Sequence, residues 1–364
     1  MKFHCERDAL AEALATAGRA ATTRTATLPI LAGVRLALHG DRLTVTGTDL
    51  ELTIELDLEV GGDLDGVAVI PARLASDIVR SLGDPRVEVE AGPDEVTISA
   101  GRSRFSVRAL PVEDYPRLGE SAQDAVTLPA GEFGEALRQV VRAASTDDSR
   151  PILTGVLLAA EGDGLRLVAT DSYRLAVRDL AGASVLARDQ RVLVPSRALQ
   201  ELQRLLSGGD EVTLRLGQRE ATFEVGPTRL TTRLIEGEFP NYRQLIPTAQ
   251  PNKLAVSREA LLDAIRRVRI LARDSTPVRL ALREDGVTLT AITQDVGNAA
   301  DELDAVLTGS EMTIAFNPDY LAAGVEAAGG EMVSIETLDA LRPVVLRAVD
   351  HDEYLYLLMP VRVP

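Results

Sequence analysis

The chain has 364 residues, of which 45% are hydrophobic and 26% charged, so it can form two or three domains with real cores, and a disordered chain is excluded. With 39 Lys and Arg against 55 Asp and Glu, the formal net charge of −16 argues against nucleic acid as a partner, because phosphates are bound by basic groups. The single cysteine, Cys5, excludes a disulfide framework, and three scattered histidines cannot build a Cys/His zinc site.

The N-terminal segment Met1–Glu6 does not lead into the apolar stretch of a signal peptide. No run approaches the roughly 18 apolar residues that a membrane span requires. The protein is therefore expected to be cytoplasmic, with its thiol in a reducing compartment.

Two short sequence markers each occur three times, in the same order and about 120 residues apart. The first marker combines a proline with apolar residues, and its copies are Leu28–Val34, Arg150–Val156 and, weakly, Thr276–Leu280. The second places a proline after apolar residues, and its copies are Val69–Leu74, Leu193–Ala198 and Ala315–Tyr320. Two independent markers with one period predict three tandem structural repeats.

Each repeat is predicted to begin with a short strand and an amphipathic helix, because apolar residues recur at helical spacing. These first helices are expected near 8–20, 131–144 and 257–273. A hairpin of alternating strands follows, with Gly/Asp turns at 39–41, 161–164 and 284–286. The second marker then opens a second helix, at 72–82, 196–206 and 319–328, and an antiparallel meander such as 86–90, 95–99 and 104–109 closes the repeat.

Two helices and about eight strands in roughly 120 residues predict an α+β domain, with helices on one face of antiparallel sheets. Polar or proline-rich segments near 119–125 and 247–253 separate the repeats. Three domains are therefore expected, over 1–120, 125–247 and 253–364.

Motifs of phosphate-binding loops, nucleophile elbows and zinc proteases are absent from the sequence, which disfavours an enzyme and gives no reason to expect a cofactor or a metal. The acidic clusters Asp147-Asp148 and Asp350–Glu353 could act as acid/base groups or metal ligands. They fall at a repeat junction and a hairpin turn, where solvated carboxylates are common. Asp49 and Asp171 occupy the same place in the first two repeats, so each is expected to hold a turn.

Charge is unevenly distributed among the predicted elements. The six predicted helices together carry about +2, while the strands and loops carry about −18. A ring or groove could present such a helical layer as a basic interior. The most basic helix, 257–273, contains Arg258, Arg266, Arg267, Arg269 and Arg273, although a solvated helix face explains that pattern equally well.

The C-terminal segment is apolar almost to its end, where most chains become polar. Alternation predicts a final strand through Leu358. The residues Met359–Val361 lie beyond it, and they are available as a core plug or as part of an apolar pocket rim, for which methionine is well suited.

The repeats and four specific segments carry a family resemblance. The segments are Leu28–Gly33, Ala169–Val177, Glu236–Tyr242 and Met359–Arg362. With these motifs and over its whole length, the chain resembles the bacterial sliding clamp family, the β subunit of DNA polymerase III. The motifs are short but specific in combination.

The resemblance implies a homodimer in which two three-domain subunits join head to tail into a ring of six similar domains. Helices would line a hole that admits double-stranded DNA, which the ring would encircle without sequence preference, and the sheets would lie outside. Replicative and repair DNA polymerases and a clamp loader are the implied protein partners. Such a ring confers processivity on the polymerase and needs no catalytic residue, no cofactor and no metal.

The resemblance also assigns site residues. The implied DNA-facing residues are Arg24, Arg73, Arg150 and Arg197. The implied partner-peptide pocket consists of Leu153, Thr170, Ser172, Tyr173, Arg174, Leu175, Pro240, Gln244, Leu245, Leu341, Pro343, Leu357, Met359, Pro360, Val361 and Arg362. The implied dimer interface contains Phe105 and Val107 on one edge and Ile270 and Leu271 on the other.

Four pocket residues depart from the family pattern. Gln244 stands where many clamps carry a basic residue, Tyr173 and Ser172 replace the common His and Gly, and Pro343 replaces a frequent Ser. These departures leave open a specialised clamp paralogue with altered pocket selectivity, serving repair or inhibitor resistance. A hydrolase that uses the junction carboxylates is a third hypothesis, and it predicts metal-dependent turnover abolished by Asp147→Ala.

Overall fold

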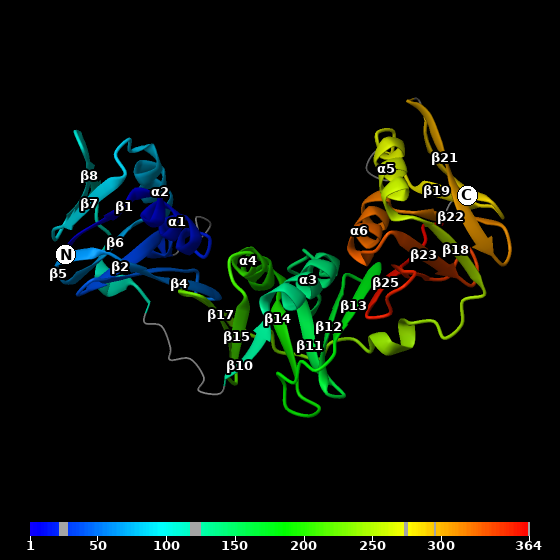
Figure 1. Ribbon diagram of the computed structural model, residues 1–364, viewed down its shortest axis with the longest axis horizontal. Coiled ribbons are helices and arrows are strands. Elements are labelled where there is room, and N and C mark those ends of the chain that lie inside the picture. Colours follow the sequence, from blue (N-terminus) through cyan, green and yellow to red (C-terminus); the bar gives the residue numbers. More distant parts are fainter. Residues whose placement is uncertain (22–27, 117–124, 273–275, 295, 363–364) are drawn as a thin grey trace. The chain divides into compact units, whose positions relative to one another are not determined.

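The computed structural model describes residues 1–21, 28–116, 125–272, 276–294 and 296–362 (Figure 1). The chain divides into two compact units, each made of two segments. Unit one contains Met1–Gly131 and Gln200–Leu234, and unit two contains Glu132–Leu199 and Ile235–Pro364. No helix of the described residues is long and apolar enough to cross a membrane.

The order of elements repeats three times along the chain, as the sequence predicts. Repeat one contains β1 (Lys2–Glu6), α1 (Arg7–Gly18), β2 (Gly33–His39), β3 (Arg42–Thr48), β4 (Leu52–Glu59), β5 (Gly61–Leu64), β6 (Gly66–Pro71), α2 (Ala72–Ser81), β7 (Arg86–Ala91), β8 (Glu95–Ala100) and β9 (Ser103–Arg108). Repeat two contains β10 (Ala125–Pro129), α3 (Ala130–Val140), β11 (Gly155–Glu161), β12 (Gly164–Thr170), β13 (Arg174–Leu180), β14 (Arg191–Pro195), α4 (Ser196–Leu206), β15 (Glu211–Leu216), β16 (Glu220–Val225) and β17 (Thr228–Arg233).

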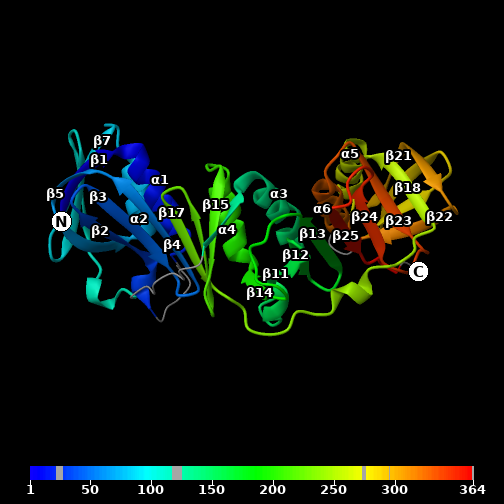
Figure 2. The same ribbon diagram turned by 60° about the horizontal axis from the view of Figure 1, so that its bottom comes forward.

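Repeat three contains β18 (Asn252–Ser257), α5 (Arg258–Arg269), β19 (Val278–Leu282), β20 (Gly286–Thr293), β21 (Gly297–Thr308), β22 (Met312–Phe316), α6 (Pro318–Ala328), β23 (Met332–Thr337), β24 (Val344–Ala348) and β25 (Tyr354–Leu358). Short 3-10 turns also recur, and those at Pro29–Ala32 and Pro151–Thr154 coincide with the first sequence marker. Within repeat one α1 and α2 lie together over the strands, and within repeat three α5 and α6 do the same (Figure 2).

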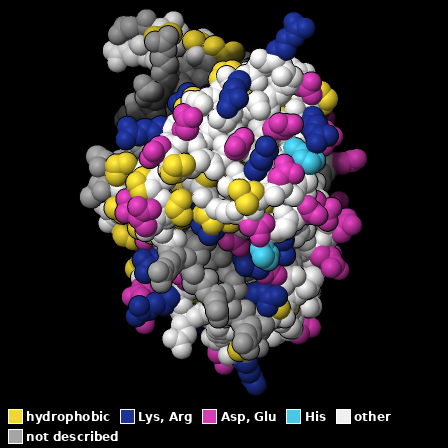
Figure 3. All heavy atoms as spheres, turned by 90° about the vertical axis from the view of Figure 1, so that its left-hand side faces the viewer, with side chains coloured by type: hydrophobic (Ala, Val, Ile, Leu, Met, Phe, Trp, Pro, Cys, Tyr) yellow, Lys and Arg dark blue, Asp and Glu magenta, His cyan; other side chains and the backbone are white. Residues whose placement is uncertain are grey.

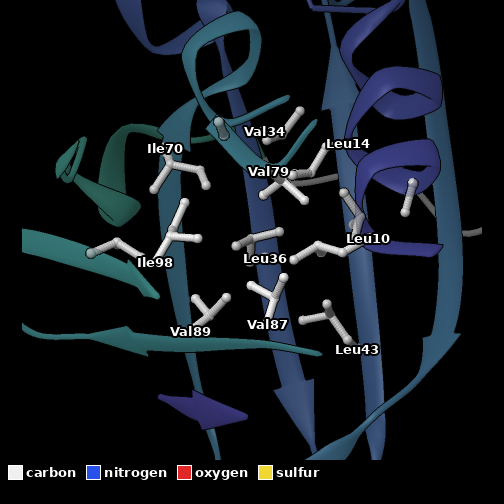
Figure 4. Packing of buried hydrophobic residues seen from close by; sticks show 14 of the residues in the cluster. Leu10, Leu14, Val34, Leu36, Leu43, Ile70, Val79, Val87, Val89 and Ile98 are labelled. Atoms are coloured by element: carbon white, nitrogen blue, oxygen red, sulfur yellow. The ribbon is translucent and has the colours of Figure 1, made fainter. Parts of the chain in front are cut away.

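The core of repeat one explains why its apolar residues recur at two different spacings. Leu10 and Leu14 project from α1 toward Leu36 of β2, while Val89 and Ile98 approach from a second sheet (Figure 4). The apolar residues at helical spacing thus form one side of the core, and the apolar residues that alternate along the strands form the other sides. The contact is close, because a side chain at Gly47 of β3 would collide with the carbonyl group of Ala17 in α1.

Every ladder among the named strands is antiparallel, and strands of adjacent repeats pair directly. In unit one, β4 pairs with β17, so that Leu52 lies opposite Thr232. In unit two, β13 pairs with β25, so that Arg174 lies opposite Leu358. We call these two contacts seam one and seam two.

The two seams have the same register. Leu52 and Arg174, which are 122 residues apart, each form the last of five residue pairs in their ladder, with Thr232 and Leu358 respectively. The backbone hydrogen bonds that flank the two ladders match as well. The amide of Arg233 donates to the carbonyl of Glu51 at 3.0 Å, and the amide of Met359 donates to the carbonyl of Tyr173 at 2.9 Å. Repeat two therefore contributes strands to both units, with β10 and β15 to β17 in unit one and β11 to β14 in unit two.

Candidate functional site

A tight turn, Thr170–Arg174, joins β12 to β13 in unit two. Asp171 is buried, and its Oδ1 accepts the backbone N–H groups of Tyr173 at 2.9 Å and Arg174 at 3.0 Å. The hydroxyl of Thr170 accepts the amide of Ser172 and donates to the carbonyl of Arg174. Ser172 has a φ of 81°, in the left-handed region, where every residue except glycine is strained.

The same turn occurs in repeat one at Thr48–Leu52. Oδ1 of Asp49 accepts the amides of Glu51 and Leu52, and Leu50 has a φ of 77°. The prediction that Asp49 and Asp171 hold turns is therefore confirmed.

The second carboxylate oxygen of Asp171, Oδ2, accepts a hydrogen bond from Nε of Arg174 at 2.9 Å. The guanidinium carbon of Arg174 lies 4.3 Å from the ring centroid of Tyr320, in the first turn of α6. Tyr173 stacks on the same ring, with centroids 6.4 Å apart and planes inclined by 30°. Burial would lower the pKa of Arg174, but Tyr356 and Asp171 raise it, so the side chain is a permanent cation beneath an aromatic ring.

The C-terminal segment runs beside this turn. The amide of Met359 donates to the carbonyl of Tyr173, and that of Val361 donates to Ala315 at 2.7 Å. Met359 and Val361 each expose 38% of their surface, which excludes a core plug and leaves both side chains at the surface beside the turn.

An apolar cluster lies next to the turn and contains Leu175, Leu357 and Tyr242 as buried members, with Ile152 and Phe239 packed against it. Of the other predicted pocket residues, Leu153, Pro343 and Pro360 are partly buried. Leu245 and Leu341 expose 51% and 66% of their surface, and Pro240, Gln244 and Arg362 are also exposed. The turn, the end of β25 and the C-terminal segment are thus in direct contact with one another, and the buried apolar cluster lies beside them.

Sequence reasoning did not assign Tyr320 or Tyr242 to the site. Tyr320 ends the third copy of the second sequence marker, and Tyr242 belongs to a segment that carries the family resemblance. Tyr320 could have been found by asking which aromatic residues fall inside the repeated markers, and Tyr242 by asking which fall inside the segments of family resemblance.

The predicted DNA-facing arginines lie in different settings. Arg73 and Arg197 occupy corresponding positions in the first turns of α2 and α4, and both are exposed. Arg150 lies beside the turn, where it contacts Asp147 at 3.0 Å and the Ser172 hydroxyl at 3.3 Å. Arg24 falls outside the described residues.

The arginines of α5 are held by neighbours rather than left free. Arg266 binds Asp263 at 2.9 Å, Arg267 binds Asp301 at 2.5 Å, and Arg269 binds Asp319 at 2.5 Å. Arg258 donates to the carbonyl of Gly330, and Arg273 falls outside the described residues. These ion pairs are largely exposed and therefore weak, so each arginine of this helix face stays in contact with solvent and can exchange its partner.

The carboxylate of Asp147, at the repeat junction, has a structural role. Asp147 accepts hydrogen bonds from the hydroxyl and amide of Ser149 and from Arg150, and the Ser149 bonds are the main reason that the pKa of Asp147 is lowered. An ionised, capped carboxylate is a poor general acid. Within the described ranges, no three His, Cys, Asp or Glu side chains come together as a metal site.

The four predicted interface residues differ in exposure. Ile270 exposes 77% and Phe105 38% of their surface, and Leu271 is partly exposed. Val107 exposes only 4%, because its side chain packs in the core of repeat one. The side chain of Val107 is therefore not available at the surface of this chain, although its backbone lies on β9, at an edge of the sheet.

Three homologous α+β repeats, joined by antiparallel sheets and with paired helices in repeats one and three, define the DNA-clamp class of fold. Family models of the DNA polymerase III beta subunit match the whole chain: the N-terminal domain at residues 1–119, the central domain at 127–241 and the C-terminal domain at 243–362. The chain belongs to the bacterial sliding clamp family, the beta subunit of DNA polymerase III.

Individual relatives agree with this assignment. The beta sliding clamp of Streptomyces coelicolor is 36% identical over 374 residues, covering 100% of this chain and 99% of the relative. A beta sliding clamp homolog, GriR of Streptomyces muensis, is 32% identical over 328 residues, covering 89% and 88%. The crystal structure of a Bartonella birtlesii sliding clamp bound to griselimycin matches with a TM-score of 0.94 and 30% identity, covering 100% of both chains.

Proposed function

We propose that the protein is a processivity clamp without catalytic residues, two copies of which join head to tail into a ring around duplex DNA. The observation that carries the proposal is the shared register of the two seams, combined with a free strand edge in each of repeats one and three. A clamp loader and replicative and repair polymerases are the proposed partners, acting in the cytoplasm.

The two free edges correspond to the two sides of a seam. Among the described residues, β9 is one of the two edge strands of its sheet, opposite β5, and the segment 297–304 of β21 pairs only with β20. In repeat order, β9 corresponds to β17 and β25, while β21 corresponds to β4 and β13. A second copy therefore allows β9 of one subunit to pair with β21 of the other, and the contact closes because it is repeated at both ends.

Transferring the seam register gives specific neighbours across this third seam. Phe105 falls opposite Ala299 of the partner subunit, so a large side chain meets a small one, and Arg102 falls opposite Glu302 of the partner subunit. Ile270, at the end of α5, supplies a further exposed apolar group. Hydrophobic side chains also gather on the face of repeat one that Figure 3 shows.

Disulfide cross-linking tests the register. Ser106 and Asn298 are exposed and fall opposite each other across the third seam, so a chain carrying Ser106→Cys and Asn298→Cys is expected to form a covalently closed dimer on oxidation. Burial raises the pKa of the native Cys5 to about 12, which keeps it out of the reaction.

The matched control combines Ser106→Cys with Ala300→Cys, on the same strand face but two residues out of register. Equal cross-linking of both pairs, or a monomer by light scattering at micromolar concentration, would contradict the proposed seam.

Arg24, Arg73, Arg150 and Arg197 are proposed to face the DNA. The corresponding positions of Arg73 and Arg197 on two helices support a repeated, sequence-independent contact with phosphates. The exchangeable ion pairs of α5 also favour loose contacts over a fixed site.

The turn, the apolar cluster and the C-terminal rim are proposed to bind short linear peptides of partner proteins. An apolar floor with a few fixed polar groups suits the insertion of hydrophobic side chains. Deletion of Met359–Pro364 is expected to abolish polymerase binding, measured by surface plasmon resonance, while light scattering still finds the dimer. Retained polymerase binding would refute the pocket.

A specialised clamp paralogue is the second candidate function, favoured by Ser172, Tyr173 and Pro343 at positions where the family commonly differs and by the relative described as a clamp homolog. Complementation decides between the two. A replicative clamp supports growth when it is the only clamp gene of the cell, and a specialised copy does not.

A further inference from the structure

We infer that Asp171 is a positioning residue of the proposed peptide pocket: its carboxylate holds Arg174 against Tyr320 and thereby fixes the wall on which Tyr173 and Met359 are placed. This inference rests on the proposed function of the pocket. It concerns a side chain that lies behind the binding surface rather than on it.

The repeats provide an internal comparison for Asp171. The turns at Asp49 and Asp171 share their backbone hydrogen bonds, and in both a single oxygen, Oδ1, accepts the two amides. Holding the turn therefore requires only one oxygen. In repeat two the other oxygen binds Arg174, whereas repeat one has Leu52 at that position.

The charge on Asp171 matters because Arg174 is buried. The side chain of Arg174 is 14% exposed and that of Asp171 is 8% exposed, so each charge would be costly to bury without the other. Removing one partner of such a pair leaves an uncompensated charge that must move toward water.

Movement of Arg174 would disturb the binding wall. Its guanidinium faces the ring of Tyr320, which belongs to repeat three, and Tyr173 of repeat two stacks on the same ring. The carbonyl of Tyr173 in turn holds the amide of Met359. The series Asp171, Arg174, Tyr320 thus links the turn to α6 and sets the position of the C-terminal rim.

The test compares Asp171→Asn with Asp49→Asn in the full-length protein. The asparagine oxygen still accepts both amides, so each turn is retained, but only Asp171→Asn removes a charge from Arg174. The probe is a fluorescein-labelled synthetic peptide carrying the clamp-binding segment of the replicative polymerase, and its Kd is measured by fluorescence anisotropy.

We expect Asp171→Asn to weaken peptide binding by about tenfold, and Asp49→Asn to change it by less than about twofold. Unfolding in urea should reveal a larger loss of stability for Asp171→Asn, because it leaves the charge of Arg174 without its partner. Cooperative unfolding that begins well above the urea-free assay conditions shows that both variants are folded when the peptide is added, which separates positioning from folding. Equal peptide affinity of Asp171→Asn and the unaltered protein would overturn the inference.

A double-mutant cycle adds a readout that a merely structural role would not move. Tyr320→Leu is expected to weaken binding, and adding Asp171→Asn to it should cause little further loss, because both act through the same wall. Additive losses would contradict the inference. If the unaltered protein does not bind the peptide, the proposed pocket itself fails, and that result is distinct from either outcome above.

Discussion

Leu50 occupies a backbone conformation that favours glycine. Its φ of 77° costs an L-residue about 1–2 kcal/mol, and its side chain is 46% exposed, so little packing would be lost on truncation. Leu50→Gly is therefore expected to stabilise the protein by roughly 0.5–1 kcal/mol, measured by urea unfolding. Glu51→Gly, at a neighbouring position without a positive φ, should destabilise it, and stabilisation by both changes would argue against this explanation.

Asp57 in β4 gives stability that depends on pH. Burial opposes its ionisation, but hydrogen bonds from Arg42 and Thr44 outweigh that effect and hold the pKa of its carboxyl below the usual value. The unfolded chain therefore takes up a proton first as the pH falls below about 5, and the contribution of Asp57 is lost as the pH approaches its lowered folded pKa.

Asp57→Asn should accordingly destabilise the protein at pH 7 by about 1 kcal/mol or less, since the pair is partly exposed. The difference from the unaltered protein should shrink in urea unfolding at pH 3. A difference that grows on acidification would reverse the assigned direction of the pKa shift.

At the scale of elements, the approach of α1 to its sheet depends on one glycine. A Cβ at Gly47 would meet the backbone of Ala17, which cannot move aside as a flexible side chain can. Gly47→Ala should destabilise the protein by about 2–4 kcal/mol in urea unfolding. Gly83→Ala is the control, because no atom lies within 4 Å of its Cβ position.

The sequence predicts the elements themselves well, because helical spacing, strand alternation and the proline markers are local signals. The second helices at 72–82 and 196–206 correspond closely to Ala72–Ser81 and Ser196–Leu206. The seams were not predictable in this way, since pairing of β4 with β17 joins residues far apart in sequence and leaves no local pattern.

The site was predicted in part. Alternation places Phe105 and Val107 on one face of β9, but it cannot tell that only Val107 is covered by the core. The turn aspartates were identifiable because they recur, whereas the contact of Arg174 with Tyr320 requires the pairing at seam two. The remaining residues of the proposed pocket rest on the family resemblance and stay a prediction.

For the whole molecule, the net charge of −16 is compatible with the proposed DNA partner only because charge is distributed unevenly among elements. If retention on DNA depends on a closed ring rather than on affinity, protein loaded on a nicked circular plasmid should be lost within minutes of linearisation. On the uncut circle it should persist, as measured by gel filtration of the complex. Equal loss from both DNAs would indicate ordinary groove binding.

The pairing at seam one also has a consequence for biosynthesis. Strand β4 leaves the ribosome roughly 170 residues before β17, the neighbour that completes its sheet. At roughly 5–20 residues per second, the nascent chain presents an unpaired edge for about ten to thirty seconds. During that interval a holdase chaperone, or strand β17 of a second nascent chain on the same polysome, competes for β4, so translation speed between the two strands becomes a determinant of yield.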